Sequence, residues 1–255
     1  MKKVSLSLFI LSLIVIIGAL YYPEQPQLVI SASRIKVDAM NFECGATDVR
    51  NLLEYAGEKV DEIKRPVIGE AAVELNKFLP ESPLMNFAAD ALLEMSQRYS
   101  DEKVDISITN KGGLRSELQQ GMITFGDIYN VFPFENTLAF LTLSGEQLWQ
   151  LCGEIASVGG EAIGGMRLEM TSDGELLSVH VDGVPLDDMS KTFRVVTSDY
   201  LAQGNDKMTA LALGTDRVVM YDVTIRDIMV QYIKESAERG EKLSAVCDGR
   251  IKIME

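Results

Sequence analysis

Apolar residues recur with helical spacing in several segments, and each of these begins at a residue that commonly caps a helix. Ser82 followed by Pro83 is typical of a helix start, and the apolar residues that follow fall on one face. In other segments a hydroxyl residue is followed three positions later by an acceptor side chain, which is the capping-box pattern. Helices are therefore predicted after Ser82, Thr124, Ser144 and Thr224, and the last should end near Gly240.

Other segments alternate apolar and polar residues with the period of a β-strand. The clearest is Val104–Ile108, and Asp173-Gly174 is a typical hairpin turn between two more. Because helices and strands intermix without a strict β–α–β alternation, a mixed sheet with helices on its outer faces is favoured. The further strands are expected at Ala139–Leu143, Met166–Met170, Leu176–Val181 and Phe193–Thr197.

The N-terminus carries the pattern of an export signal. Lys2 and Lys3 precede an apolar run that reaches Tyr22, and Ala19 is a candidate cleavage position. An uncleaved anchor is the alternative, since the run is close to the ~20 residues that span a bilayer. We assign residues 1–22 to a signal peptide or N-terminal anchor, 23–35 to a linker, and 36–255 to one compact domain. The protein is therefore expected to be exported, either periplasmic or membrane-anchored and facing the periplasm.

Composition and charge narrow the function. The chain has 255 residues, of which 47% are hydrophobic and 24% charged, as in an ordinary globular protein. Its net charge of −14 argues against nucleic acid as a partner, because nucleic-acid binding needs a basic surface. His180 is the single histidine, whereas metal centres that activate water usually draw on several imidazoles. Neither a catalytic residue nor a metal site is therefore expected in this chain.

The three cysteines, Cys44, Cys152 and Cys247, do not have the spacing of a metal site. Cys152 is expected to be a buried apolar residue on a helix. Cys44 and Cys247 lie near the two ends of the chain and could form a disulfide in an oxidising compartment, which the sequence alone does not establish.

Three segments could bind a ligand. In Asn110–Arg115, two glycines allow close backbone approach to an anion and the arginine adds a guanidinium. In Phe132–Asn136, rings on either side of a proline could stack on a base. In Thr197–Asp206, a tyrosine could supply a second ring and the last aspartate could accept hydrogen bonds from a diol. The alternatives are a tight turn, core packing of both phenylalanines, and a polar surface loop, respectively.

Two glycine pairs and the lone histidine add less specific signals. Gly159-Gly160 and Gly164-Gly165 indicate either a loop that approaches a ligand or a flexible turn. His180 alternates with valines on a predicted strand, which leaves its partner and role open.

In their order along the chain, these segments resemble the C-terminal domain of the 5'-nucleotidase / UDP-sugar hydrolase family. The resemblance begins near Val67 and continues to about Met208. Three matches in order are more specific than any one alone. The resemblance implies an α+β fold, a four-layer αββα arrangement with mixed sheets in a single domain. The most specific matches are Asn110–Arg115, Gly121–Asp127 leading into Phe132-Pro133-Phe134, and Asp199–Asp206.

The resemblance also implies roles for individual positions. An amide and a guanidinium would contact the substrate on its phosphate or ribose side, and two rings would hold the base between them. A carboxylate would bind ribose hydroxyls, while an asparagine and a glycine would line the base pocket. The substrate contacts would come from Asn110 and Arg115, and the two rings would be those of Phe134 and Tyr200. The carboxylate would be Asp206, and the base pocket would be lined by Asn136 and Gly165.

The family's catalytic half, a metallophosphoesterase domain with a two-metal centre, has no counterpart before residue 67, a region that is short and lacks histidine. Pro80 stands where the family often has an arginine. The chain is therefore expected to be the substrate-recognition half of an exported 5'-nucleotidase-type hydrolase. A separate metallophosphoesterase would be its partner and would carry the divalent metals, with no cofactor in this chain. The alternatives are a non-catalytic nucleotide- or nucleoside-binding protein and an exported domain that has lost ligand binding.

Overall fold

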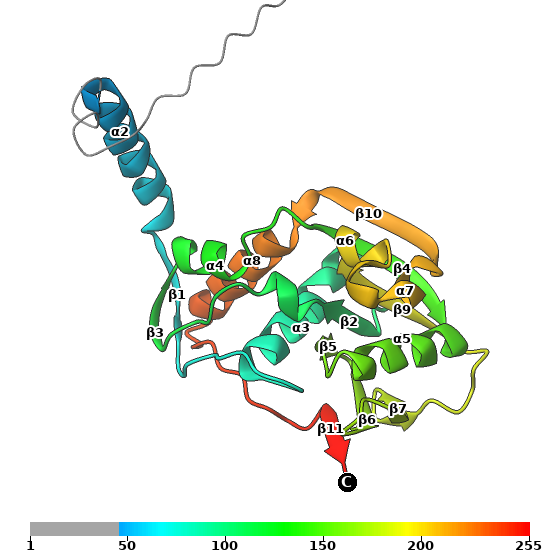
Figure 1. The fold of residues 1–255 in the computed structure, drawn as a ribbon. Coiled ribbons are helices and arrows are strands. Elements are labelled where there is room, and N and C mark those ends of the chain that lie inside the picture. The colour runs from blue at the N-terminus through cyan, green and yellow to red at the C-terminus, as the bar shows by residue number, and fades with distance from the viewer. Residues whose placement is uncertain (1–45) are drawn as a thin grey trace, which may run out of the picture. The chain divides into compact units, whose positions relative to one another are not determined.

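The computed structural model describes residues 46–255 (Figure 1). The predicted signal peptide or anchor, the linker and Cys44 lie outside these residues. The chain divides into two units, residues 1–52 and residues 53–255, and the site described below lies in the second. The predicted domain start at residue 36 falls before this second unit.

Helices and short 3₁₀ turns separate the strands along the chain. The helices are α2 (Ala46–Lys64), α3 (Pro83–Ser96), α4 (Phe125–Val131), α5 (Gly145–Ser157), α6 (Asp199–Ala202), α7 (Thr209–Ala212) and α8 (Ile225–Glu238). The 3₁₀ turns are η1 (Gln97–Tyr99), η2 (Lys111–Gly113) and η3 (Asn205–Lys207). The strands are β1 (Val67–Ala71), β2 (Ile106–Thr109), β3 (Gly121–Thr124), β4 (Thr137–Ser144), β5 (Ala162–Gly164), β6 (Met166–Thr171), β7 (Leu176–Val181), β8 (Val184–Pro185), β9 (Thr192–Ser198), β10 (Thr215–Thr224) and β11 (Ile251–Met254).

The four predicted helix starts are confirmed by their capping hydrogen bonds. The Ser82 side chain accepts a hydrogen bond from the backbone of the third residue of α3, and Pro83 occupies the first turn. Complete capping boxes begin α4 at Thr124, α5 at Ser144 and α8 at Thr224. Each box satisfies backbone N–H groups that would otherwise lack a partner in the first turn, which is why the helices begin at these residues.

The strands form a central mixed sheet of five strands and two smaller sheets. The central order is β10-β4-β9-β2-β5, in which β2 pairs with β9 in parallel and the other neighbours are antiparallel. A four-stranded sheet has the order β11-β6-β7-β8, and β1 pairs with β3. The expected hairpin between β6 and β7 is present. One predicted strand is shifted, because the Val104–Ile108 pattern becomes β2 at Ile106–Thr109.

Two hydrophobic cores lie in the second unit. The first joins α3 and α8, which lie side by side, to Leu138, Phe140 and Val196 of the central sheet (Figure 1). The second joins α5 to other residues of the central sheet and to β6 and β7. Helices and sheets thus form layers around these cores, and the predicted α+β class with mixed sheets in a single domain is confirmed.

Candidate functional site

Three segments that are distant in sequence meet at one end of the central sheet. Because β2 and β9 are parallel, their carboxyl ends lie together, and they lead into Asn110 and into α6. Strand β4 is antiparallel to β9, with Leu138 opposite Ser198, so its amino end lies at the same place. The Thr137 amide donates to Asp199 Oδ1 at 2.9 Å and ties the start of β4 to α6. Sheet topology therefore brings the three predicted binding segments together.

The first segment is a tight loop around η2. Gly113 N–H donates to Asn110 O, and Arg115 N–H donates to Val131 O, each at 2.9 Å. A Cβ atom at Gly113 would lie 2.8 Å from Asn110 Oδ1, so a larger residue would displace this buried amide. Within residues 46–255, Asn110 Oδ1 has no hydrogen-bond partner. The glycine therefore allows the loop to fold closely against the Asn110 side chain.

The two phenylalanines of the second segment lie in different environments. Phe132 is 6% exposed and belongs to the first core, whereas Phe134 is 49% exposed. The segment is held from both sides, because the Ile225 amide donates to Asn136 O at 2.9 Å and the Arg226 guanidinium donates to Phe132 O at 3.1 Å. Core packing thus accounts for one ring only, and the other is presented at the surface.

The third segment presents Tyr200 and Asp206 on short turns after β9. Ser198 caps α6, and Asp206 has a left-handed backbone with φ 53°. Both oxygens of Asp206 accept hydrogen bonds, from the Tyr200 hydroxyl at 2.8 Å and from Asn110 Nδ2 at 2.6 Å. The hydrogen bond to Asp206 raises the pKa of the Tyr200 phenol. This carboxylate therefore connects the third segment to the first.

These segments enclose a cavity of about 350 Å³. It lies at the lower end of the size range of small-molecule sites, which starts near ~300 Å³. A smaller cavity beside it is lined by Phe132, Phe134 and Ile225 among others. The main cavity is lined by six of the seven predicted residues, Asn110, Arg115, Phe134, Asn136, Tyr200 and Asp206, together with Gly112.

The seventh predicted residue, Gly165, is not part of this cavity, and its predicted place in the base pocket is wrong. Strand β5 is antiparallel to β2, so Gly165, which follows β5, lies at the opposite end of the sheet. Its φ is +76°, and a Cβ atom there would lie 2.0 Å from Asp105 O. This glycine is required for a close backbone crossing rather than for a ligand.

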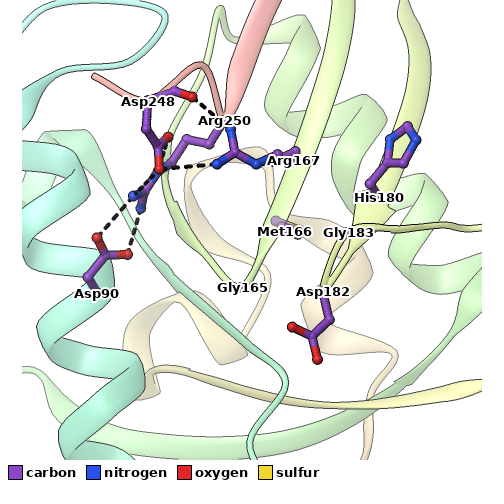
Figure 2. A pocket seen from close by; sticks show the side chains of 9 residues that line it. All are labelled: Asp90, Gly165, Met166, Arg167, His180, Asp182, Gly183, Asp248 and Arg250. Atoms are coloured by element: carbon purple, nitrogen blue, oxygen red, sulfur yellow. Dashed lines mark hydrogen bonds and ion pairs between the residues drawn. The ribbon is translucent and has the colours of Figure 1, made fainter. Parts of the chain in front are cut away.

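Gly165 lines a different cavity, of about 310 Å³, which also contains the single histidine (Figure 2). The charged groups of this cavity are largely paired with one another. The buried Arg250 donates to Asp90 at 2.7 and 2.9 Å and to Asp248 at 3.1 Å, and Arg167 also donates to Asp248. These bonds link the segment before β11 to α3 and β6, which gives the cluster a structural role.

Arg115 is the cation available to an anionic ligand in the main cavity. Its side chain is exposed, and within residues 46–255 it forms no ion pair. The two lysines near the loop already donate hydrogen bonds to the backbone. Lys77 Nζ donates to Leu114 O at 2.6 Å, and Lys111 Nζ donates to carbonyl groups after α5. Among the described residues, the cavity therefore combines the Arg115 guanidinium, which forms no ion pair and donates only to Gly112 O at 3.4 Å, with two exposed rings and one carboxylate.

Gly112, one of the two glycines expected to allow close approach to a ligand, lines the cavity. The sequence did not predict Glu161, which is buried behind the loop and accepts a hydrogen bond from the Lys111 backbone. The sequence signal for Glu161 is its position directly after the glycine pair Gly159-Gly160.

Two other expectations concern metals and cysteines. Among residues 46–255, no group of three or more His, Cys, Asp or Glu side chains is arranged to hold a metal ion. In the same range, no helix is both long and apolar enough to cross a membrane.

Cys152 is buried on α5 as predicted, and burial raises the pKa of its thiol to about 12. Cys247 is exposed, and Cys44, with which it could pair, lies outside the described range.

Comparison with known proteins gives a consistent result. Residues 63–213 match the family model "5'-nucleotidase, C-terminal domain". The chain is 26% identical over 224 residues to the trifunctional nucleotide phosphoesterase protein YfkN of Bacillus subtilis, covering 80% of this chain and 15% of that protein. It is 33% identical over 138 residues to a probable 5'-nucleotidase of Treponema pallidum, covering 47% of this chain and 23% of that protein.

Among solved structures, the 5'-nucleotidase precursor of Thermus thermophilus superposes with a TM-score of 0.70 and 29% identity, covering 81% of this chain and 43% of that one. The chain thus spans less than half the length of these relatives. The family match identifies this layered α+β domain as a nucleotidase-type substrate-binding domain. The chain belongs to the family of 5'-nucleotidase C-terminal domains.

Proposed function

We propose that this chain recognises the base and ribose of a nucleotide as the substrate-binding part of an exported 5'-nucleotidase-type hydrolase. The observation that carries the proposal is the meeting of Phe134, Tyr200 and Asp206 in one cavity with Arg115. Aromatic faces stack on bases, a carboxylate accepts hydrogen bonds from a diol, and a guanidinium binds phosphate. Each chemical group of a nucleoside monophosphate thus has a complementary side chain.

Within this proposal, the metal-dependent step belongs to a separate metallophosphoesterase that holds the divalent metals. Membership of the 5'-nucleotidase family supports this division, as does the presence of a single histidine in the sequence. Export is supported by the two lysines and the apolar run at the N-terminus. The residues of this chain would bind and orient the substrate while the partner domain cleaves the phosphate ester.

The test is a calorimetric titration of adenosine and AMP against the wild-type chain and against a Phe134→Ala/Tyr200→Ala variant. We expect saturable binding of one ligand per chain by the wild type and a strong loss in the double variant. Equal affinities for the two proteins, or no binding by the wild type at millimolar ligand, would reject the proposal. Addition of a metallophosphoesterase domain of the 5'-nucleotidase type should then produce metal-dependent release of phosphate from AMP.

A further inference from the structure

Lys111 lies within the ligand-binding loop, but its contacts are made behind the loop. Its Nζ donates to Val158 O at 2.7 Å and to Gly160 O at 2.8 Å, and it lies 3.3 Å from Glu161 Oε1. Its backbone N–H donates to Glu161 Oε2 at 2.5 Å. One carboxylate therefore holds both the main chain and the side chain of the same loop residue.

Glu161 is placed for this contact by the sheet. It directly precedes β5, and because β5 is antiparallel to β2, its amino end lies beside the carboxyl end of β2 where the loop begins. The Glu161 side chain is only 5% exposed, whereas Asn110, Gly112 and Arg115 of the loop line the cavity. The tether thus lies on the protein side of the loop and the ligand cavity on the other side.

The loop is short, and hydrogen bonds to other segments hold it at both ends, including the bond from Asn110 Nδ2 to Asp206. Its regular structure is the single turn η2, and Gly112 and Gly113 allow many backbone conformations. At its far end, Arg115 N–H donates to Val131 O, and Lys77 holds the Leu114 carbonyl from outside. Glu161 is the buried charged contact of Lys111, so its loss should loosen the turn that carries Lys111 and Gly112.

We propose that Glu161 is a positioning residue, which acts through Lys111 to hold the loop Asn110–Arg115 in its ligand-binding conformation. The part of this inference that concerns ligand affinity rests on the proposed function. The part that concerns the order of the loop stands on the contacts alone. A change at Glu161 should therefore alter the loop first and ligand affinity as a consequence.

The tether depends on the ionised form of Glu161. Burial raises the pKa of Glu161, the hydrogen bonds and charge of Lys111 oppose this, and the like charge of Asp206 raises the pKa further. The charged groups that face Glu161 are thus Lys111 from the loop and Asp206 from η3. The pKa of Glu161 is higher in the folded than in the unfolded protein. The contribution of Glu161 to the free energy of unfolding therefore falls as pH rises through the window between these two pKa values. If the loop opens while Glu161 stays buried, the carboxyl loses the Lys111 contacts that lower its pKa, and its pKa rises further. Acidification should therefore favour the loosened loop, without a loss of global stability from this residue.

The first measurement is amide hydrogen exchange of residues 111–115 in the ligand-free full chain at pH 7. We expect these amides to exchange about tenfold faster in Glu161→Gln than in wild type, since loss of a local tether lowers the cost of local opening. Glu169→Gln is the matched control, because Glu169 is a partly buried glutamate on β6 that bonds Ser178. That control should exchange as wild type.

Three further readouts distinguish positioning from general support. In the wild type, loop protection corrected for intrinsic exchange should fall on acidification, at a pH above the ordinary range of glutamate, and Glu161→Gln should show no such step. Adenosine affinity should fall about tenfold in Glu161→Gln with little change in melting temperature. Lys111→Gln removes the same ion pair together with the Nζ bonds to Val158 O and Gly160 O, and it gives a second measurement of the tether should Glu161→Gln not fold.

Wild-type exchange of the loop in both Glu161→Gln and Lys111→Gln would overturn the inference. A uniform rise in exchange across the domain would also overturn it, because that result indicates a general packing role. Absence of adenosine binding by the wild-type protein would reject the proposed function alone, since the exchange measurement needs no ligand.

Discussion

Substitutions at Phe132 and Phe134 allow effects on ligand affinity to be distinguished from effects on protein stability. Phe134 is 49% exposed and lines the ligand cavity, whereas Phe132 is 6% exposed and belongs to the first core. Replacing Phe134 with alanine removes one face of the expected clamp. Replacing Phe132 with alanine removes the same atoms from a packed interior.

The expected magnitudes follow from these environments. A base–aromatic stack is worth about 1–3 kcal/mol, so Phe134→Ala should raise the dissociation constant of adenosine roughly 5- to 150-fold. Its free energy of unfolding should change by about 1 kcal/mol or less, as for other exposed positions. Phe132→Ala should instead cost about 3–5 kcal/mol of stability, the usual loss for a buried phenylalanine.

The second ring is tested in the same way, with Tyr200 replaced by alanine or by phenylalanine. Tyr200→Ala should weaken adenosine binding by about 1–3 kcal/mol, whereas Tyr200→Phe keeps the ring and loses only the hydrogen bond to Asp206. Tyr221→Ala is the matched control, because this tyrosine is 80% exposed on β10 and does not line the cavity. Calorimetry gives the affinities and urea denaturation gives the stabilities. Wild-type affinity in folded Phe134→Ala and Tyr200→Ala would refute the stacking clamp.

Three further predictions address the rest of the cavity and its surroundings. Arg115→Ala should weaken AMP binding by about 1.5–3 kcal/mol and adenosine binding less, with Arg115→Lys between wild type and alanine; an equal loss for both ligands in calorimetry would place Arg115 on the sugar. Gly165→Ala should destabilise the protein more than Gly183→Ala, because both glycines have positive φ but an added Cβ would meet a neighbouring atom only at Gly165. Adenosine affinity should not change in Gly165→Ala. A loss of affinity in the folded variant would restore Gly165 to the site. The isolated chain should not hydrolyse AMP with Mn²⁺ or Zn²⁺, and a chelator should not alter its adenosine affinity; metal-dependent turnover by a phosphatase-free preparation would contradict the division of labour.

Local chemistry explains which elements the sequence predicts well. Capping residues determine where α3, α4, α5 and α8 begin, and their hydrogen bonds involve only the next three positions of the chain. Strand β10 was missed because it is an edge strand with mostly exposed residues, so it lacks a buried face to impose alternation. Strands β1 and β3 lack a regular alternation of buried and exposed residues, and β5 has only three residues.

The site shows a similar limit. The resemblance to the 5'-nucleotidase C-terminal domain predicted Asn110, Phe134, Tyr200 and Asp206, and the sheet brings these residues together in one cavity. Composition could not say which of Phe132 and Phe134 is buried, because that depends on where α4 ends. Nor could the glycine pairs show which end of β5 faces the cavity, because the antiparallel pairing of β5 with β2 is a long-range choice. The error at Gly165 and the omission of Glu161 have this same cause.

The most direct test of the central claim is a crystal structure of the chain with adenosine or AMP. The account predicts the base between the rings of Phe134 and Tyr200, the ribose hydroxyls within hydrogen-bond distance of Asp206, and the phosphate of AMP at Arg115. A nucleoside bound elsewhere, or a cavity empty at saturating ligand, would contradict it.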